Sequence, residues 1–368
     1  MSTHGVGIAG WGAAGRLMAA ALANSARFRL AGVADTDAAA RERAAAETGC
    51  RVHPEVASLA ASADVDVVYV ATPTATHLPA IRAAAAQGKH VISEKPLTTT
   101  LEDARLAVEA ADHAGVVLLV GATHSYHAPV RVLRRLVEDG TLGPLLSVSA
   151  NCHTDWHRRP RSAADLDAAQ GNGLVLRQGA HQIDVLRYVC GGLTESVTGT
   201  TFGGADGTEL GFSAQLAFPG GVHASAYYIG TGGFDSRFQT WGVGELGTFD
   251  VAPTPAAARF FALPGEGAVS PVFGTLAATF ADGGAWVTPT GALVFAGGDV
   301  TEISAEDRAS GWQALLAELA EALDGHPAVH TGRWGLATLE VALALHESAR
   351  TGRRVGLHHQ VPVSRSEE

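Results

Sequence analysis

A glycine-rich turn near the N-terminus has the spacing that nucleotide phosphates require. The turn Gly10-Trp11-Gly12-Ala13-Ala14-Gly15 follows the apolar run Val6–Ala9 and opens an alanine-rich stretch, so it joins an expected strand to an expected helix. The first glycine permits the tight bend, the second admits a pyrophosphate, and the third lets the helix pack against the strand. The amino end of the helix offers N–H groups to the phosphates. A turn that binds nothing is the alternative, but the strand and helix around it favour a dinucleotide site.

An acidic residue stands where the ribose of such a dinucleotide would lie. Asp35 ends the second apolar run, Arg29–Ala34, about 20 residues after Gly15, which is the usual spacing for a carboxylate that binds the ribose hydroxyls. A 2′-phosphate would be repelled by Asp35 and by Asp37, and no Arg or Lys follows directly. We therefore expect NAD as the cofactor in preference to NADP.

Two loops follow the strands that we expect at 65–71 and 90–93, and one of them carries a lysine. Ligands of open α/β sheets bind beyond the carboxyl ends of the strands, so both loops should face the cofactor. Lys95 lies in the second loop, where a nearby cation or partial desolvation would let a lysine exchange protons near neutrality. The alternative is an ordinary exposed lysine. The predicted cofactor-binding residues are Gly10, Trp11, Gly12, Ala13, Ala14, Asp35, Thr72, Pro73, Thr74, His77, Glu94 and Lys95.

The elements that must position these loops alternate along the first third of the chain. Short, wholly apolar runs are separated by alanine-rich helical stretches, which predicts an α/β domain with a parallel, doubly wound sheet. The expected strands are 6–9, 29–34, 65–71, 90–93 and 116–120, and the expected helices are 15–23, 37–48, 76–87 and 101–114.

The pattern changes after residue 122. A helix at 129–138, a strand at 145–150 and a helix at 181–189 precede a strand-rich region, 195–300, which is broken by glycine turns. Two amphipathic helices, at 311–323 and 333–350, close the chain. We expect a Rossmann domain over 1–122 and an α+β domain over 123–368 that carries a large, mainly antiparallel open sheet.

Composition excludes several classes of protein. The chain has 368 residues, a formal charge of −11 and only three cysteines. Its single dense basic run, Arg158–Arg161, is too short to indicate a nucleic-acid partner. We find no apolar run long enough for a membrane span and no signal peptide, so we expect a cytoplasmic protein. The 16 histidines form no H-E-x-x-H motif, and we expect no functional metal.

The motifs together resemble the glucose–fructose oxidoreductase/inositol dehydrogenase/MocA family. The likeness rests on Gly10–Gly15 with Asp35, on Thr72-Pro73, on Glu94-Lys95-Pro96, and on Gly179–Asp184, which matches that family's G-x-H-x-x-D segment. It extends over nearly the whole chain. It implies the two domains above, a nicotinamide cofactor, a homodimer or homotetramer formed through the C-terminal sheet, and Lys95 with His181 as the catalytic pair.

One position departs from the family's pattern. The family often has a catalytic Asp two residues before the glycine of G-x-H, whereas this chain has Arg177 there. Arginine is not a base, but its guanidinium binds carboxylates in a bidentate manner. We therefore count Arg177 with the catalytic residues. It would contact either a substrate carboxylate or a protein acid such as Asp155 or Asp165.

A narrower resemblance concerns the substrate. The segments around Trp156, Arg159-Pro160-Arg161, Leu176–Gln182 and Gly233–Arg237 resemble the phthalate dihydrodiol dehydrogenase branch, whose substrates would be carboxylated cyclohexadiene cis-diols. The predicted substrate-binding residues are His124, Trp156, Arg159, Arg177, Gln178 and His181.

The predicted activity is reversible hydride transfer between a secondary alcohol and nicotinamide. We expect His181 to act as base and Lys95 to stabilise the developing alkoxide and relay protons. A sugar or cyclitol dehydrogenase, a biosynthetic ketone or imine reductase, and an NAD-binding regulator without activity are the alternatives.

Overall fold

A computed structural model describes the chain at residues 3–154, 156–158, 166–167, 172–204, 208–231, 276–288, 290–306 and 309–363. By its internal contacts the chain divides into two compact units. The first contains the described part of Met1–Ala122 and Trp312–Leu339, and the second contains the described part of Thr123–Gly311 and Glu340–Val363. The sequence-based division places both closing helices in the second domain, whereas by contacts the first unit takes Trp312–Leu339.

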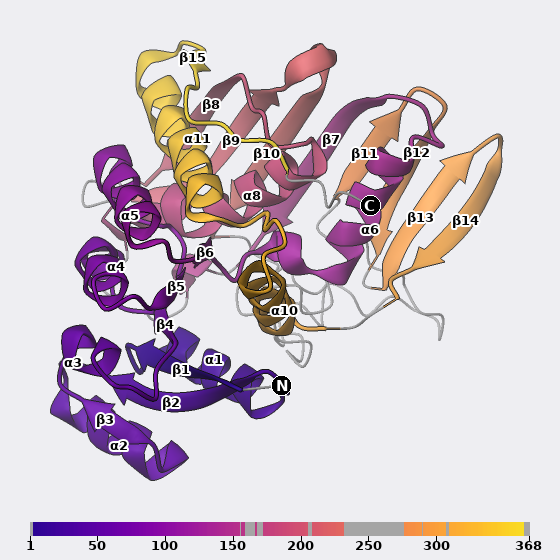
Figure 1. Ribbon diagram of the computed structural model, residues 1–368. Helices are drawn as coiled ribbons and strands as arrows, with labels where there is room; N and C mark the ends of the chain where they lie inside the picture. Colours follow the sequence, from indigo (N-terminus) through magenta and orange to yellow (C-terminus); the bar gives the residue numbers. More distant parts are fainter. Residues whose placement is uncertain are drawn as a thin grey trace. The chain divides into compact units, whose positions relative to one another are not determined.

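The first unit is built on a six-stranded parallel sheet, as the alternating apolar runs predict. The strand order is β3-β2-β1-β4-β5-β6, so the connections reverse direction between β1 and β4 (Figure 1). All of its strand pairs are parallel. The strands are β1 (His4–Ala9), β2 (Phe28–Ala34), β3 (Arg51–His53), β4 (Val67–Val70), β5 (His90–Ser93) and β6 (Leu118–Val120).

The helices of this unit pack on the sheet, and two of them end at a glycine in the left-handed conformation, Gly49 and Gly115. Helices α4 and α5 pack side by side (Figure 1). Helix α5 shows why the sequence folds this way: Thr100 Oγ1 accepts from Asp103 N at its start, and Gly115 ends it in the left-handed conformation with a φ of 63°. The helices are α1 (Ala13–Ala23), α2 (Ala38–Thr48), α3 (Val56–Ala60), α4 (His77–Ala85), α5 (Leu101–Ala114) and α10 (Gly311–Leu323).

A turn near residue 330 pairs with the last strand of this sheet. Leu119 pairs with Thr331, and Val120 N donates to His330 O. The buried His330 side chain lies 2.7 Å from Glu318 of α10, and Trp312 at the start of α10 packs edge-on against Tyr69. These contacts hold α10 and the turn in the first unit. Helix α11 (Gly332–Thr351) begins directly after the turn.

The second unit is built on a nine-stranded sheet with the order β14-β13-β12-β11-β7-β10-β9-β8-β15. Its pairs are antiparallel except for β7 and β10, which are parallel, so the expected mainly antiparallel sheet is confirmed. The strands are β7 (Leu145–His153), β8 (Ser196–Gly203), β9 (Glu209–Ala217), β10 (His223–Ile229), β11 (Ala277–Phe280), β12 (Gly283–Thr288), β13 (Gly291–Ala296), β14 (Asp299–Ser304) and β15 (Val355–Gly356).

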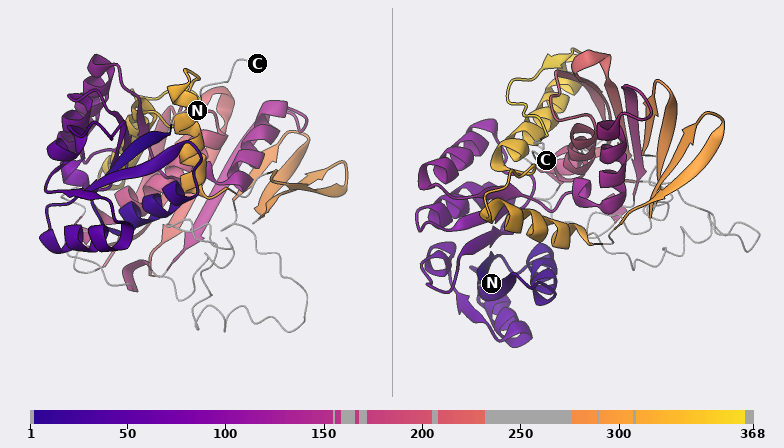
Figure 2. Two further views of the ribbon diagram at one scale, coloured as in Figure 1. Left: turned by 60° about the horizontal axis from the view of Figure 1, so that its bottom comes forward. Right: turned by 45° about the vertical axis from the view of Figure 1, so that its right-hand side comes forward.

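Helices cover one face of this sheet. Helix α6 (Ala128–Asp139) packs on β12 and β13, and α8 (Ala180–Val189) packs on β7 and β10 (Figure 2). Short helical turns precede each of them: η2 (His124–Tyr126) precedes α6, and η5 (Val175–Gly179), a π-helical turn, precedes α8. The buried face includes Val148, Ala226, Leu216 and Val294. The sheet therefore supports the two turns on which the candidate residues lie.

Most predicted helices match closely, whereas three short elements, β3, α3 and β15, were not predicted. Helices expected at 311–323 and 181–189 are observed at Gly311–Leu323 and Ala180–Val189. The three short elements have three, five and two residues, which are too few for a hydrophobic period to show. Within the described residues, no helix combines the length and the apolar character needed to cross a bilayer.

Candidate active site

The glycine turn of the first unit links β1 to α1 beside the end of β4. Gly10 has a φ of 101°, which L side chains rarely adopt, and a Cβ there would lie 2.5 Å from Ala71 O. At Gly15 a Cβ would lie 2.2 Å from Gly10 O, so any side chain would push the helix off the turn. These two positions need glycine for the fold itself.

Gly12 differs from its neighbours because nothing fills the space beside it. A Cβ at Gly12 would meet no atom within 4 Å, and its φ and ψ of −83° and −161° are open to any residue. Helix α1 starts at the next residue with no side chain capping its first turn and no acidic residue in it. The open space and the uncapped N–H groups of Ala13 and Ala14 fit a dinucleotide pyrophosphate.

Asp35 lies directly beside this turn. Its Oδ2 accepts from Trp11 N at 2.8 Å and its Oδ1 accepts from Asp37 N at 2.9 Å. Each carboxylate oxygen keeps acceptor capacity for a ribose hydroxyl, and the negative charge disfavours a phosphate. Sequence reasoning missed Arg41, whose Nη1 donates to the Asp35 carbonyl at 2.8 Å and to the Thr36 carbonyl at 3.1 Å. Its guanidinium thus braces the loop that carries Asp35.

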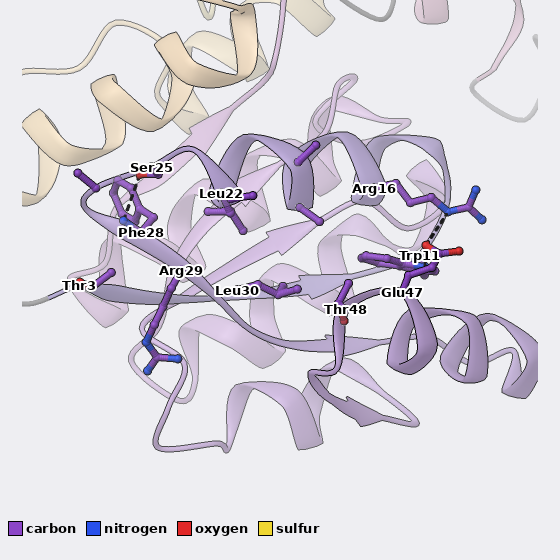
Figure 3. A pocket seen from close by; sticks show the side chains of 14 residues that line it. Thr3, Trp11, Arg16, Leu22, Ser25, Phe28, Arg29, Leu30, Glu47 and Thr48 are labelled. Atoms are coloured by element: carbon purple, nitrogen blue, oxygen red, sulfur yellow. Dashed lines mark hydrogen bonds and ion pairs between the residues drawn. The ribbon is translucent and has the colours of Figure 1, made fainter.

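The Trp11 side chain packs outward onto α2. It is 3% exposed, and its indole N–H donates to Glu47 Oε2, which also lies 3.7 Å from Arg16 Nε. Figure 3 shows these three side chains at one end of a cavity of about 680 Å³ that runs along α1 and β2. Neither Gly12 nor Asp35 is among its described lining residues, so this cavity is not the phosphate site. Only the backbone of Trp11 therefore belongs to the glycine turn, where its N–H donates to Asp35.

His77 joins the two loops that follow β4 and β5. It is 1% exposed, its Nε2 lies 2.9 Å from Thr72 O, and its Nδ1 lies 3.1 Å from Pro96 O and 3.1 Å from Leu97 O. The ring therefore fixes the Thr72 loop relative to the Lys95 loop. The predicted role of His77 in binding a cofactor would therefore be exerted through the positions of these two backbones. Pro73 and Thr74 lie in the same loop, and Thr74 is buried.

Glu94 fixes the backbone on which Lys95 lies. Its Oε1 accepts from the Tyr69 hydroxyl at 2.6 Å and its Oε2 accepts from Lys95 N at 3.1 Å. Burial raises the pKa of Tyr69 well above its usual value, and the charge of Glu94 adds to this effect. The phenol therefore stays a donor to Glu94. Lys95 itself is partly exposed at the end of β5, where a ligand can reach it.

In the second unit, His181 lies on α8 and stacks against His124 of η2. Their ring centroids are 4.0 Å apart and their planes differ by only 9°. His181 is 2% exposed, whereas His124 is partly exposed. The edge of His127 faces His124 with centroids 5.5 Å apart. Burial, together with the charge of Arg131, lowers the pKa of His127 to about 4, so this third ring is neutral at working pH.

Asp184 holds the turn that carries His124. One carboxylate oxygen accepts from Thr123 Oγ1 at 2.6 Å and also from Ser125 Oγ, and the two hydroxyls are 2.8 Å apart. Asp184 is 1% exposed and lies one helical turn after His181. Asp184 is the last residue of the G-x-H-x-x-D segment, but the sequence alone predicted no role for it. Its position in that segment was the signal that could have identified it.

Arg177 and Gln178 lie on the π-helical turn η5, a conformation that is frequent at functional sites. Gln178 is buried, and its Oε1 accepts from the Tyr228 hydroxyl, which pairs with Thr154 Oγ1 at 2.9 Å. Arg177 is partly exposed, and Trp156 is fully buried. Several residues named in the sequence analysis lie outside the described residues: Asp155, the run Arg159-Pro160-Arg161, Asp165 and the segment Gly233–Arg237. Within the described ranges, no group of three His, Cys, Asp or Glu side chains could hold a metal ion.

Comparisons with known proteins match both units. A family model described as an oxidoreductase family with an NAD-binding Rossmann fold (GFO_IDH_MocA) matches residues 4–122, and the model of the GFO/IDH/MocA C-terminal domain matches residues 130–249. The chain is 30% identical to 1-carboxy-3-chloro-3,4-dihydroxycyclohexa-1,5-diene dehydrogenase of Comamonas testosteroni over 94% of either chain. It is 31% identical to inositol 2-dehydrogenase of Rhizobium meliloti (strain 1021), over 53% of this chain and 57% of the relative. A solved structure of an inferred dehydrogenase from Bordetella bronchiseptica RB50 matches with a TM-score of 0.87 and 30% identity, covering 96% of this chain and 100% of that one.

Proposed function

Because the chain belongs to the GFO/IDH/MocA family of NAD-dependent oxidoreductases, we propose that it oxidises a ring hydroxyl of a carboxylated cyclohexadiene cis-diol. The family and the hydride-transfer chemistry at an alcohol carbon are shown by the comparisons. The proposal adds the class of substrate and the roles of individual residues.

The observation that carries the choice of substrate is Arg177. It is partly exposed on a π-helical turn that continues into the helix of His181, at the position where the family often has an acid. A guanidinium at this place suits a substrate carboxylate, because it binds the two oxygens in a fork. The name of the Comamonas testosteroni relative describes a carboxylated dihydroxycyclohexadiene, which is a substrate of this kind.

The protein's own groups would act as follows. His181 takes the proton of the reacting hydroxyl, and Lys95 donates to the same oxygen while negative charge develops on it. Arg177 holds the ring carboxylate, and Glu94 with His77 keeps the Lys95 loop in place. NAD, when bound, supplies the nicotinamide carbon that accepts the hydride.

The chemistry of a dihydrodiol favours the oxidative direction. Loss of a hydride and a hydroxyl proton from one CH–OH group leaves a ketone, and loss of the remaining ring hydrogen to solvent with reprotonation of the oxygen gives a catechol. The overall change is diol plus NAD to catechol plus NADH and one proton. The aromatic product makes the reaction nearly irreversible.

The test is NADH formation at 340 nm with a panel of carboxylated ring diols, neutral ring diols, sugars and cyclitols, with NAD and NADP in parallel. We expect turnover with NAD on carboxylated diols, and in Arg177→Ala an increase in KM of at least about tenfold, since a charge-assisted bidentate contact contributes about 1.5–3 kcal/mol. Arg29→Ala is the control, because Arg29 is an exposed arginine. A substitution of Arg187 would not be a suitable control, because Arg187 is buried. Turnover confined to neutral sugars or cyclitols, with no effect of Arg177→Ala, would reject the substrate class and leave the family chemistry standing.

The face of the second sheet opposite helix α6 supports a proposal about assembly. Trp286 and Phe295 pack edge to face with centroids 6.0 Å apart, and Val300 is paired opposite Phe295. The three side chains share one face of the sheet and are 47%, 37% and 58% exposed. An apolar cluster of this kind is typical of a protein–protein interface.

We infer that a second copy of the chain covers this face, in a homodimer or homotetramer. Sedimentation equilibrium should give an oligomer for the wild type and a smaller species for Trp286→Glu. The control is Gln87→Glu, which adds the same charge at an exposed position of the first unit. A wild-type monomer at micromolar concentration would contradict the inference.

The cytoplasmic location also stays a prediction, which fractionation of producing cells checks.

A further inference from the structure

The stacked imidazoles of the second unit are two titratable groups in contact, and the proposed mechanism uses only one of them. His124 and His181 lie with centroids 4.0 Å apart and planes nearly parallel. Two positive charges at this separation repel strongly, so a pair of this kind takes up protons as one coupled unit. The question is which ring takes the first proton.

The difference in burial determines which of the two rings is protonated first. His181 is 2% exposed, and a charge on it would be removed almost completely from water. His124 is partly exposed and therefore keeps some hydration when it is charged. The first proton belongs on His124.

The surroundings oppose a second proton. Among the described residues, the elements packed against the pair carry the guanidinium groups of Arg131, Arg134 and Arg135 on α6, Arg177 on η5 and Arg187 on α8, and the carboxylates of Glu138 and Asp139 on α6 and Asp184 on α8. Their other titratable groups are His127 between η2 and α6, Tyr126 of η2, Tyr188 of α8, Cys152 and His153 of β7, and His223, Tyr227 and Tyr228 of β10. Guanidinium groups therefore outnumber carboxylates among these described residues, five to three. Asp184 is moreover buried and bonded to the hydroxyls of Thr123 and Ser125. With one proton already on His124, the environment keeps His181 neutral.

The turn that carries His124 is held rigidly enough to maintain this contact. Thr123 and Ser125 flank His124 on both sides, and both donate to the same Asp184 oxygen. Asp184 and His181 lie three residues apart on α8, so the helix that carries one ring also anchors the turn that carries the other. The stack is thereby built into two elements of the same unit.

We propose that His124 acts through His181: it takes the first proton at low pH, and its charge keeps His181 neutral and available as the base. This inference rests on the proposed role of His181. Its consequence is an activity that persists to lower pH than a single histidine base would permit.

The experiment compares wild type with His124→Phe, which preserves an aromatic ring in the stack but cannot be protonated. The acid limb of the kcat/KM profile should move to higher pH by at least about half a unit, because His181 then takes the first proton itself. His223→Phe, an exposed histidine on β10, is the control and should leave the limb unchanged. An unchanged limb in a folded His124→Phe enzyme overturns the proposal.

A direct measurement keeps the proposal testable even when the variant does not fold. In the wild-type protein with isotope-labelled histidine, NMR titration should show His124 protonating at higher pH than His181. The reverse order overturns the proposal. His181→Asn separates this inference from the proposed function: retained turnover in that variant rejects His181 as base, whereas lost turnover together with the reverse order rejects only the role of His124.

Discussion

Replacement of Lys95 with alanine should lower kcat at least about a hundredfold, since a positioned acid–base group contributes 10²–10⁴-fold to the rate. The lysine lies at the end of β5, and its backbone is fixed by Glu94 and, through Pro96, by His77. Neither of these bonds involves the ammonium group, so the loop should keep its structure in the variant. NAD affinity, measured by quenching of protein fluorescence, should change by less than about threefold.

The chain offers a clean control for this variant, because Lys89 is its only other lysine and lies in the same unit. Lys89→Ala should keep wild-type turnover. Lys95→Arg distinguishes two roles: substantial activity would indicate that the charge alone matters, and loss equal to that of Lys95→Ala would indicate proton relay. Wild-type kcat in Lys95→Ala would remove Lys95 from the mechanism.

Alanine at Gly12 and alanine at Gly15 should have opposite effects on stability and on binding. At Gly12 the added methyl group meets no protein atom and the backbone is unstrained, so the melting temperature should stay within about 2 °C. The methyl group would occupy the open space where we place the pyrophosphate. We expect NAD to bind at least about tenfold more weakly, which corresponds to about 1.4 kcal/mol.

At Gly15 the added methyl group lies 2.2 Å from Gly10 O, and the helix must move. Overpacking of this kind costs about 1–3 kcal/mol, so Gly15→Ala should lower the melting temperature measurably. Calorimetry for binding and thermal denaturation for stability, applied to both variants, form the test. Unaltered NAD binding in Gly12→Ala would show that the pyrophosphate lies elsewhere.

The chain's own residues were sufficient to predict the parallel sheet, the mainly antiparallel sheet and the positions of most helices. The reason is local: continuous apolar runs are typical of strands buried on both faces, and helices such as α5 carry their start and stop signals within a few residues. Gly10, Gly15 and Asp35 were also identifiable, because the spacing of a phosphate turn and the acid after the next strand is fixed by the fold.

Only the tertiary structure decided which side chains meet. The stack of His124 on His181 joins residues more than fifty positions apart, and the bonds of Asp184 to Thr123 and Ser125 do the same. No periodicity in the sequence encodes such a contact, since it follows from how α8 and η2 pack.

The direction of a side chain was likewise decided by packing. Trp11 lies in the middle of the glycine motif, yet its indole N–H donates to Glu47 of α2. His77 follows the loop at Thr72 in sequence, yet its ring binds the backbone of that loop and of the loop at Pro96. The sequence determines which chemical groups this protein has and the order of the elements that carry them. The long-range contacts of the folded chain determine which groups face each other, because burial and hydrogen bonding depend on neighbours that are distant in sequence.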